Sequence, residues 1–196
     1  MATEGPGARV EVFLDHSNFY HGLKQQFIES GGRYDFTGLV REVVRGRHLV
    51  HWNHYCGQVL AEHQPEPAAA QQRFHSYLSN RAAESRIPLK LNLRPLMYPP
   101  GFPRSRAPVE KGIDALIVQD LIVGAFDKRY DVAVLLSGDR DFCNVVEFLK
   151  VRFPALRLET LFANTRRHLY DMKPHCFDSW RVIDRHVYQR ISVKSR

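Results

Sequence analysis

The chain has 196 residues, enough for one full-sized hydrophobic core and too few for two independent ones. With 44% apolar and 25% charged residues, and no apolar run near the roughly 20 residues of a transmembrane helix, the composition excludes a disordered or membrane-spanning chain. The formal net charge of +7 favours a polyanionic partner such as nucleic acid. Residues 1–8 lack a signal-peptide pattern, so we expect a cytoplasmic protein.

The first half of the chain alternates strand and helix patterns. An apolar run predicts a strand at 9–14, and the helical pattern that follows at 17–29 has Ser17 or Asn18 near its cap. We then expect a short helix at 36–44, a strand at 48–57, a chain break at 64–67 and a helix at 68–83.

The second half continues the alternation after an irregular segment. A strand is expected at 89–97. Residues 98–110 contain four prolines and must therefore form a loop, and Arg104 and Arg106 make this loop a candidate basic flap. The remaining pattern predicts a helix at 112–126, a strand at 131–136, a helix at 141–151, a strand at 156–161, a short helix around 166–171 and a brief extended piece at 177–182.

Strands that alternate with helices predict a parallel sheet with helices on both faces. We therefore expect a Rossmann-like three-layer α/β/α fold with a mainly parallel five-stranded sheet. The expected organisation is a flexible N-terminus at 1–8, a single domain at 9–182 and a basic C-terminal tail at 183–196. Residues 164–196 carry eight Lys or Arg against three Asp, so most of the positive surplus lies there.

Carboxylates follow the predicted strands at positions that a parallel sheet brings together. Asp15 ends the first strand, Asp139 and Asp141 follow the fourth, and Asp114 opens the helix after the third. In a doubly wound sheet all parallel strands end at one edge, and the usual winding makes the first and fourth strands neighbours. The four acids would then face one cleft, unless each is separately a helix cap or a solvated loop residue.

Such a cluster needs compensation for its charge. At about 5 Å and an effective dielectric constant near 20, each ionised pair repels by about 3 kcal/mol, and the pairs among four acids together approach about 20 kcal/mol. Either some acids are protonated, or a divalent cation lies among them. Oxygen ligands without a His or Cys set favour Mg²⁺ or Mn²⁺, as one or two ions, over Zn²⁺.

The order and spacing of three motifs resemble the NYN branch of the PIN-like nuclease superfamily, which includes LabA-like and limkain-type domains. The matching motifs are Phe13-Leu14-Asp15-His16-Ser17-Asn18, Lys111-Gly112-Ile113-Asp114 with Asp120, and Ser137-Gly138-Asp139-Arg140-Asp141-Phe142. The resemblance covers about residues 9–182. The sequence departs from the family at His16, where a small residue is common.

The resemblance implies Mg²⁺- or Mn²⁺-dependent hydrolysis of RNA phosphodiester bonds. It implies Asp15, Asp114, Asp139 and Asp141 as metal ligands or base, Asp120 as an outer acid and Asn18 as a polar helper. Candidate substrate-binding residues are Ser17, Lys111, Ser137, Arg140, Arg104 and Arg106. Tyr98 and Phe102 either stack an unpaired base of single-stranded RNA or anchor their loop.

The main alternative is a catalytically silent RNA-binding or scaffold protein with the same fold. A von Willebrand A type metal site is disfavoured because Phe19 replaces a ligating serine, and a haloacid dehalogenase type site is disfavoured because Ser17 occupies the place of its second acid. His48, His51 and His54 have the wrong spacing to share one face of a strand, which argues against a zinc site.

The three cysteines, Cys56, Cys143 and Cys176, are odd in number and widely spaced. This pattern gives neither a disulfide framework nor a Cys-x-x-Cys metal motif, so we expect reduced thiols and no disulfide-linked partner. An oligomer is possible but nothing in the sequence indicates one.

Overall fold

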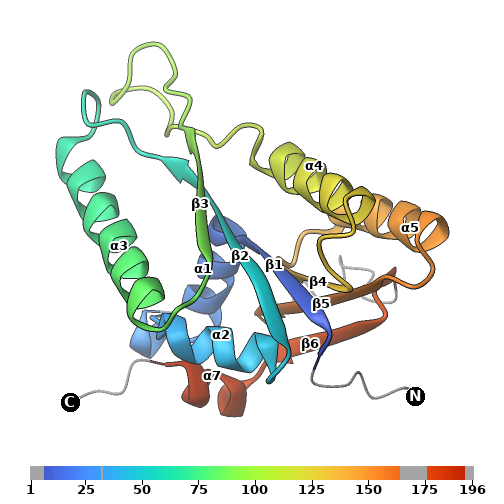
Figure 1. Ribbon diagram of the computed structural model, residues 1–196. Coiled ribbons are helices and arrows are strands. Elements are labelled where there is room, and N and C mark those ends of the chain that lie inside the picture. The colour runs from blue at the N-terminus through green and yellow to red at the C-terminus, as the bar shows by residue number, and fades with distance from the viewer. Residues whose placement is uncertain (1–6, 32, 164–175, 193–196) are drawn as a thin grey trace.

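All strands of the central sheet run parallel in the computed structural model, which describes residues 7–31, 33–163 and 176–192 (Figure 1). The strands are β1 Arg9–Asp15, β2 His48–Gln58, β3 Leu89–Pro95, β4 Val132–Leu136, β5 Arg157–Ala163 and β6 Ser179–Ile183. The helices are α1 His16–Gln26, α2 Phe36–Val44, α3 Pro65–Glu84, α4 Ile113–Phe126, α5 Cys143–Arg152 and α7 Arg185–Ile191, with 3-10 turns η1 Ile28–Ser30 and η2 Arg140–Phe142.

The strand order is β3-β2-β1-β4-β5-β6, so β1 lies between β2 and β4 near the centre of the sheet. Successive side chains of a strand point to opposite faces, so one face of β1 carries the apolar Val10, Val12 and Leu14, and the other carries Glu11, Phe13 and Asp15. Val10, Val12 and Leu14 pack with α1, α2, α3 and α7, whereas Phe13 packs with α4 and α5. Figure 1 shows these two helical layers on either side of the sheet.

The three-layer parallel architecture is therefore confirmed, with one strand more than expected in the described residues. Residues 179–183 form β6, which pairs with β5 from Glu159↔Ser179 to Ala163↔Ile183. The sequence indicated only a brief extended piece at 177–182, because three of those six residues are polar or charged. The short helix expected around 166–171 lies outside the described residues.

The fold continues beyond residue 182, where the sequence suggested a change to a tail. Ile183 is fully buried, and α7 packs against α2. The Tyr188 ring stacks on Phe27 at a centroid distance of 3.8 Å, and its hydroxyl donates to the carbonyl of Arg33. Ile191 is also fully buried, so this helix belongs to the same hydrophobic core as α1 and α2.

Helix starts differ from expectation in instructive ways. Asp15, rather than Ser17 or Asn18, caps α1, because its carboxylate accepts a hydrogen bond from the Asn18 backbone. Helix α3 begins at Pro65 instead of residue 68, because proline is tolerated in the first helical turn, where its missing N–H has no intrahelical role. None of the described helices has both the length and the apolar character to span a membrane.

Candidate active site

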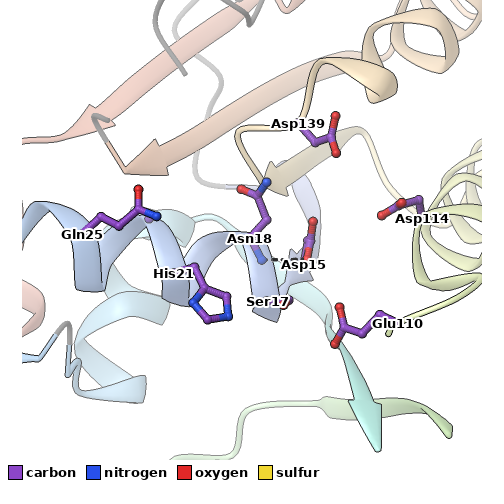
Figure 2. A pocket seen from close by; sticks show the side chains of 9 residues that line it. Asp15, Ser17, Asn18, His21, Gln25, Glu110, Asp114 and Asp139 are labelled. Carbon is purple, nitrogen blue, oxygen red and sulfur yellow. Dashed lines mark hydrogen bonds between the residues drawn. The ribbon is translucent and has the colours of Figure 1, made fainter. Parts of the chain in front are cut away.

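A pocket of about 300 Å³ opens at the carboxyl edge of the sheet, where β1 and β4 end (Figure 2). It is lined by Asp15, Ser17, Asn18, His21, Gly22, Gln25, Glu110, Asp114 and Asp139. Figure 2 shows the carboxylates of Asp15, Glu110, Asp114 and Asp139 on different sides of one space. The convergence predicted for Asp15, Asp114 and Asp139 is thus observed.

Asp15 is the most buried of these acids, with 5% of its surface exposed. One carboxylate oxygen accepts from the Asn18 backbone N–H at 3.2 Å, and the other accepts from the Ser137 hydroxyl at 3.0 Å. Burial raises the pKa of Asp15 to about 6; the two hydrogen bonds oppose that rise and the charges of Asp114 and Glu110 add to it. Asp15 is therefore both a helix cap and a pocket acid.

Asn18 and Ser137 hold the two sides of the pocket together. The Asn18 side-chain oxygen accepts from the Gly138 backbone N–H at 2.8 Å, which ties α1 to the turn after β4. Ser137 is fully buried, and its hydroxyl also accepts from the backbone N–H of Asp139 at 3.2 Å. Both residues are placed to orient carboxylates, and the burial of Ser137 does not suit the substrate contact expected from the sequence.

Asp114 and Asp139 face the pocket from different segments. Asp114 lies in the first turn of α4, and Asp139 caps η2 by accepting a hydrogen bond from the Asp141 backbone at 2.9 Å. Burial raises the pKa of Asp114, and the nearby charges of Asp139, Glu110 and Asp141 raise it further. Neighbouring negative charges therefore favour a proton or a cation at Asp114.

Glu110 is a pocket acid that sequence reasoning missed. Its carboxylate lines the pocket and accepts from the backbone N–H of Gly57 at 2.8 Å, which links the segment before α4 to the end of β2. Its position directly before the Lys111-Gly112-Ile113-Asp114 motif was the available signal. His21 and Gln25 were also missed; they follow Ser17 at intervals of four along α1, a spacing that places them on one helix face.

Two predicted acids lie outside the pocket lining. Asp141 is exposed on η2 and acts on Asp114 through its charge. The Asp120 carboxylate accepts from the Tyr55 hydroxyl at 2.8 Å and lies 4.0 Å from the Lys90 ammonium. Asp120 is thus engaged with residues of β2 and β3, as its angular separation from Asp114 on the helix indicates.

None of the predicted basic and aromatic residues lines the pocket. Lys111, Arg140, Arg104 and Arg106 are all exposed. In the flap, the Tyr98 ring packs 4.1 Å from His63 and 5.1 Å from Phe102, measured between ring centroids. The Tyr98 hydroxyl accepts from the Leu60 backbone and donates to Gln64. These contacts identify Tyr98 and Phe102 as loop anchors.

The C-terminal positive charge is partly committed to the fold. Arg181 and Arg190 both contact the carboxylate of Glu42 on α2, at 3.0 Å each. Their charges hold the pKa of Glu42 below its usual range against the effect of burial, which acts in the opposite direction. These two arginines thus join β6 and α7 to α2 instead of facing a ligand.

The histidine that departs from the family pattern points away from the pocket. His16 packs against His54 and Phe74, with ring centroids 4.8 and 5.2 Å apart. Burial lowers the pKa of His16 to about 4, so the ring is neutral near pH 7. His54 is buried beside it, whereas His48 and His51 are exposed. The three histidines of β2 therefore do not share a site, as their spacing predicts.

The pocket suits a hard divalent cation, because its acidic groups offer oxygen atoms and, among the described residues, no lysine or arginine lines it. In the described residues, no three His, Cys, Asp or Glu side chains are close enough to hold an ion as they stand. Binding would therefore draw the carboxylates inward. Burial and neighbouring acids raise the pKa of Asp15 and Asp114, and a cation bound among these acids would act in the opposite direction.

A parallel sheet covered on both faces, with a carboxylate pocket beside the junction of its first and fourth strands, defines a PIN-like α/β protein. The model of the NYN domain family matches residues 9–169, and the chain belongs to this family. The narrower resemblance to LabA-like and limkain-type domains stays a prediction.

The fold is similar to the crystal structure of a protein of unknown function, VPA0982, from Vibrio parahaemolyticus RIMD 2210633. The two chains are 20% identical, the TM-score is 0.64, and the match covers 93% of this chain and 96% of that one. No curated protein matches the chain. At this identity the likeness concerns the fold alone.

Proposed function

We propose that this protein is a metal-dependent ribonuclease that hydrolyses phosphodiester bonds of single-stranded RNA. The observation that carries the proposal is the group of carboxylates at the sheet edge, where burial and like charges raise the pKa of Asp15 and Asp114. Membership of the NYN family supports the same reaction class. Perturbed acids in a pocket are more typical of a reactive site than of a structural one.

In this proposal Asp15, Asp114 and Asp139 hold Mg²⁺ or Mn²⁺, with Glu110 and Asp141 adding negative charge around them. An ion held by these residues would supply a lower pKa for a water molecule and stabilisation of negative charge on phosphate oxygens. Asn18 and Ser137 keep Asp15 and the turn after β4 in place. One of these acids, if it is not a ligand, would serve as the base that accepts a proton from the attacking water.

The exposed cations Lys111, Arg140, Arg104 and Arg106 support a polyanionic substrate, because they would offset the repulsion between the acids and a phosphate backbone. Ser17, His21 and Gln25 add neutral polar groups along one wall. A pocket only about 300 Å³ in volume suits one unpaired nucleotide better than a duplex.

A catalytically silent RNA-binding or scaffold protein is the second candidate. The open arrangement of the acids favours it, because no three of the described ligand side chains are close enough to hold an ion as they stand. The two candidate functions differ in one testable property: the ribonuclease cleaves bound RNA when a divalent metal is present, and the silent protein binds RNA without cleaving it.

The deciding experiment is cleavage of end-labelled single-stranded RNA by purified protein with Mn²⁺ or Mg²⁺, and with EDTA. Asp139→Asn is assayed in parallel, together with Asp127→Asn, which makes the same change in charge at the opposite end of α4. We expect cleavage by the wild type and Asp127→Asn, and its loss in EDTA and in Asp139→Asn while RNA binding persists. RNA binding without metal-dependent cleavage by the folded wild type would support the silent protein instead.

A further inference from the structure

Two cysteine side chains meet directly behind the acidic turn after β4. Cys143 is the first residue of α5 and follows η2, while Cys176 lies shortly before β6. Their sulfur atoms are 3.1 Å apart, with the Cys176 thiol donating to the sulfur of Cys143. Both are buried, at 7% and 8% exposure, and neither is in a disulfide. This contact could not be predicted from the sequence, because the two cysteines are far apart in the chain.

The position of Cys176 is fixed by further contacts with α5. The Lys150 ammonium donates to the Cys176 carbonyl at 3.2 Å and lies 2.8 Å from the Asp178 carboxylate. Asp178 in turn accepts from the Leu158 backbone, so the segment around Cys176 is held between α5 and β5. The two sulfurs therefore meet through a defined local structure.

We propose that Cys143 and Cys176 are an oxidation site at which a peroxide closes an intramolecular disulfide. A disulfide bond is about 2.05 Å long, so the sulfurs need to approach by only about 1 Å. Pairs that oxidise reversibly in this way typically consist of an attacking cysteine and a resolving neighbour.

The reaction has two balanced steps. The Cys143 thiolate attacks one oxygen of hydrogen peroxide, forms a sulfenic acid and releases hydroxide. The Cys176 thiol then loses its proton, and its sulfur attacks the sulfur of the sulfenic acid, forming the disulfide and releasing water. Overall, two thiols and one peroxide give one disulfide and two waters. A dithiol reductant reverses the change by thiol exchange.

The contacts assign the order of the two sulfurs. The sulfur of Cys143 accepts the hydrogen bond from the Cys176 thiol and is the one placed to attack first. Burial, followed by the contact with Cys143, raises the pKa of Cys176 to about 12, which disfavours its thiolate. Because both thiols are buried, we expect reaction through local opening over minutes to hours.

The bond would act on the acid pocket through α5. Cys143 follows Asp139 by four residues, and η2 lies between them. Movement of the first residue of α5 by up to about 1 Å displaces this turn, and misplacement of that size in a reacting group reduces rates by as much as about 100-fold. This consequence rests on the proposed function; the thiol chemistry does not.

The test treats the full chain with hydrogen peroxide and then counts reactive thiols with a maleimide after denaturation. In the wild type we expect two thiols to disappear together, a Cys143–Cys176 cross-link in peptide mass mapping, and recovery with dithiothreitol. Cys56→Ser is the matched control, because it removes the other thiol and keeps the pair. Cys143→Ser and Cys176→Ser should each form no intramolecular disulfide.

Three reactive thiols after oxidation, a cross-link that includes Cys56, or irreversible oxidation of Cys143 without a cross-link would each overturn the proposal. Cleavage of RNA before and after oxidation tests the effect on the pocket separately. We expect oxidised Cys56→Ser to be at least about tenfold slower and dithiothreitol to restore its rate. An unchanged rate with a formed cross-link would overturn the coupling to the pocket.

Discussion

Two buried carboxylates, Asp15 on β1 and Glu159 on β5, are treated in opposite ways by the fold. Glu159 contacts Arg47 at 3.1 Å and Arg157 at 2.9 Å. Burial alone would raise the pKa of Glu159, but these two guanidinium groups outweigh it and hold the pKa below its usual value. In the described part of the chain no lysine or arginine forms an ion pair with Asp15, and acidic neighbours add to the effect of burial on its pKa. Two arginines therefore favour the charged form of Glu159, whereas burial and nearby acids disfavour the charged form of Asp15.

The largest change in stability should come from removing the main ion-pair partner of Glu159. In Arg47→Met the carboxylate remains buried with only Arg157 beside it, and we expect the free energy of unfolding to fall by about 3 to 5 kcal/mol. Urea denaturation measures this loss. Arg157→Met is the control, since its more exposed guanidinium should contribute about 1 kcal/mol or less. Equal losses in both variants would show that Glu159 is not held mainly by Arg47.

A pocket acid should show the reverse pattern, with loss of activity and retained stability. In Asp114→Asn we expect RNA cleavage to fall by on the order of 10²- to 10³-fold, or about 3 to 4 kcal/mol in the barrier. The free energy of unfolding should stay level or rise, because one of several repelling charges is gone. Single-turnover cleavage and urea denaturation are measured on the same preparation. A destabilised but fully active variant would place Asp114 with the structural acids.

The two carboxylates should also give opposite pH dependences of stability in EDTA. The pKa of Asp15 is about 6 in the folded protein, above its ordinary value of 3.8, so folding takes up a proton between these pH values and stability falls as pH rises through them. The difference amounts to at most about 3 kcal/mol. Glu159, whose pKa is lowered, instead loses its contribution as pH falls below its unfolded value of 4.5.

Unfolding of the wild type and Asp15→Asn between pH 4 and pH 7 isolates the first of these effects. Asparagine keeps the capping oxygen, so α1 should still form. We expect the fall in stability toward pH 7 to be smaller in the variant. Parallel pH profiles for the two proteins would show that Asp15 is not a strained acid.

Glu110 tests an intermediate case, because it faces the pocket and also bonds to the Gly57 backbone. Glutamine retains a backbone-accepting oxygen but removes a negative charge. We expect Glu110→Gln to need about tenfold more Mn²⁺ for half-maximal cleavage. Glu62→Gln is the control at an exposed position. If Glu110→Gln is destabilised but its metal dependence is unchanged, Glu110 supports the fold and does not contribute to metal binding.

The motifs predicted the acid pocket because they end parallel strands, and strand order brings such ends together. Asp120 fell outside it because the rotation of a helix, here about 120° from Asp114, turned it toward Tyr55. Glu110 was missed because its place depends on a hydrogen bond across a loop to Gly57, for which sequence spacing offers no rule. The expected cap was misplaced because Asp15 serves as cap and pocket acid together.

The remaining differences in the fold also depend on tertiary contacts. Strand β6 was underestimated since its polar residues gain stability from pairing with β5 and from Glu42. The Cys143–Cys176 contact joins residues that periodicity treats as unrelated. Local sequence patterns therefore identify strands and helices. Contacts between residues that are distant in the sequence determine the edge strands of the sheet, the helix caps and the side chains that pair.

Because β1 pairs with β4, which is much later in the sequence, the pocket can form only late during synthesis of the chain. Asp15 at the end of β1 and Ser137 just after β4 are hydrogen-bonded to each other, although they are 122 residues apart in the sequence. At about 5 to 20 residues per second, a ribosome needs roughly 6 to 24 s to add that length. During this interval one edge of β1 has no β4 to pair with, and the acids have not met. The acids of the pocket therefore cannot come together before the turn that contains Ser137 and Asp139 has been translated.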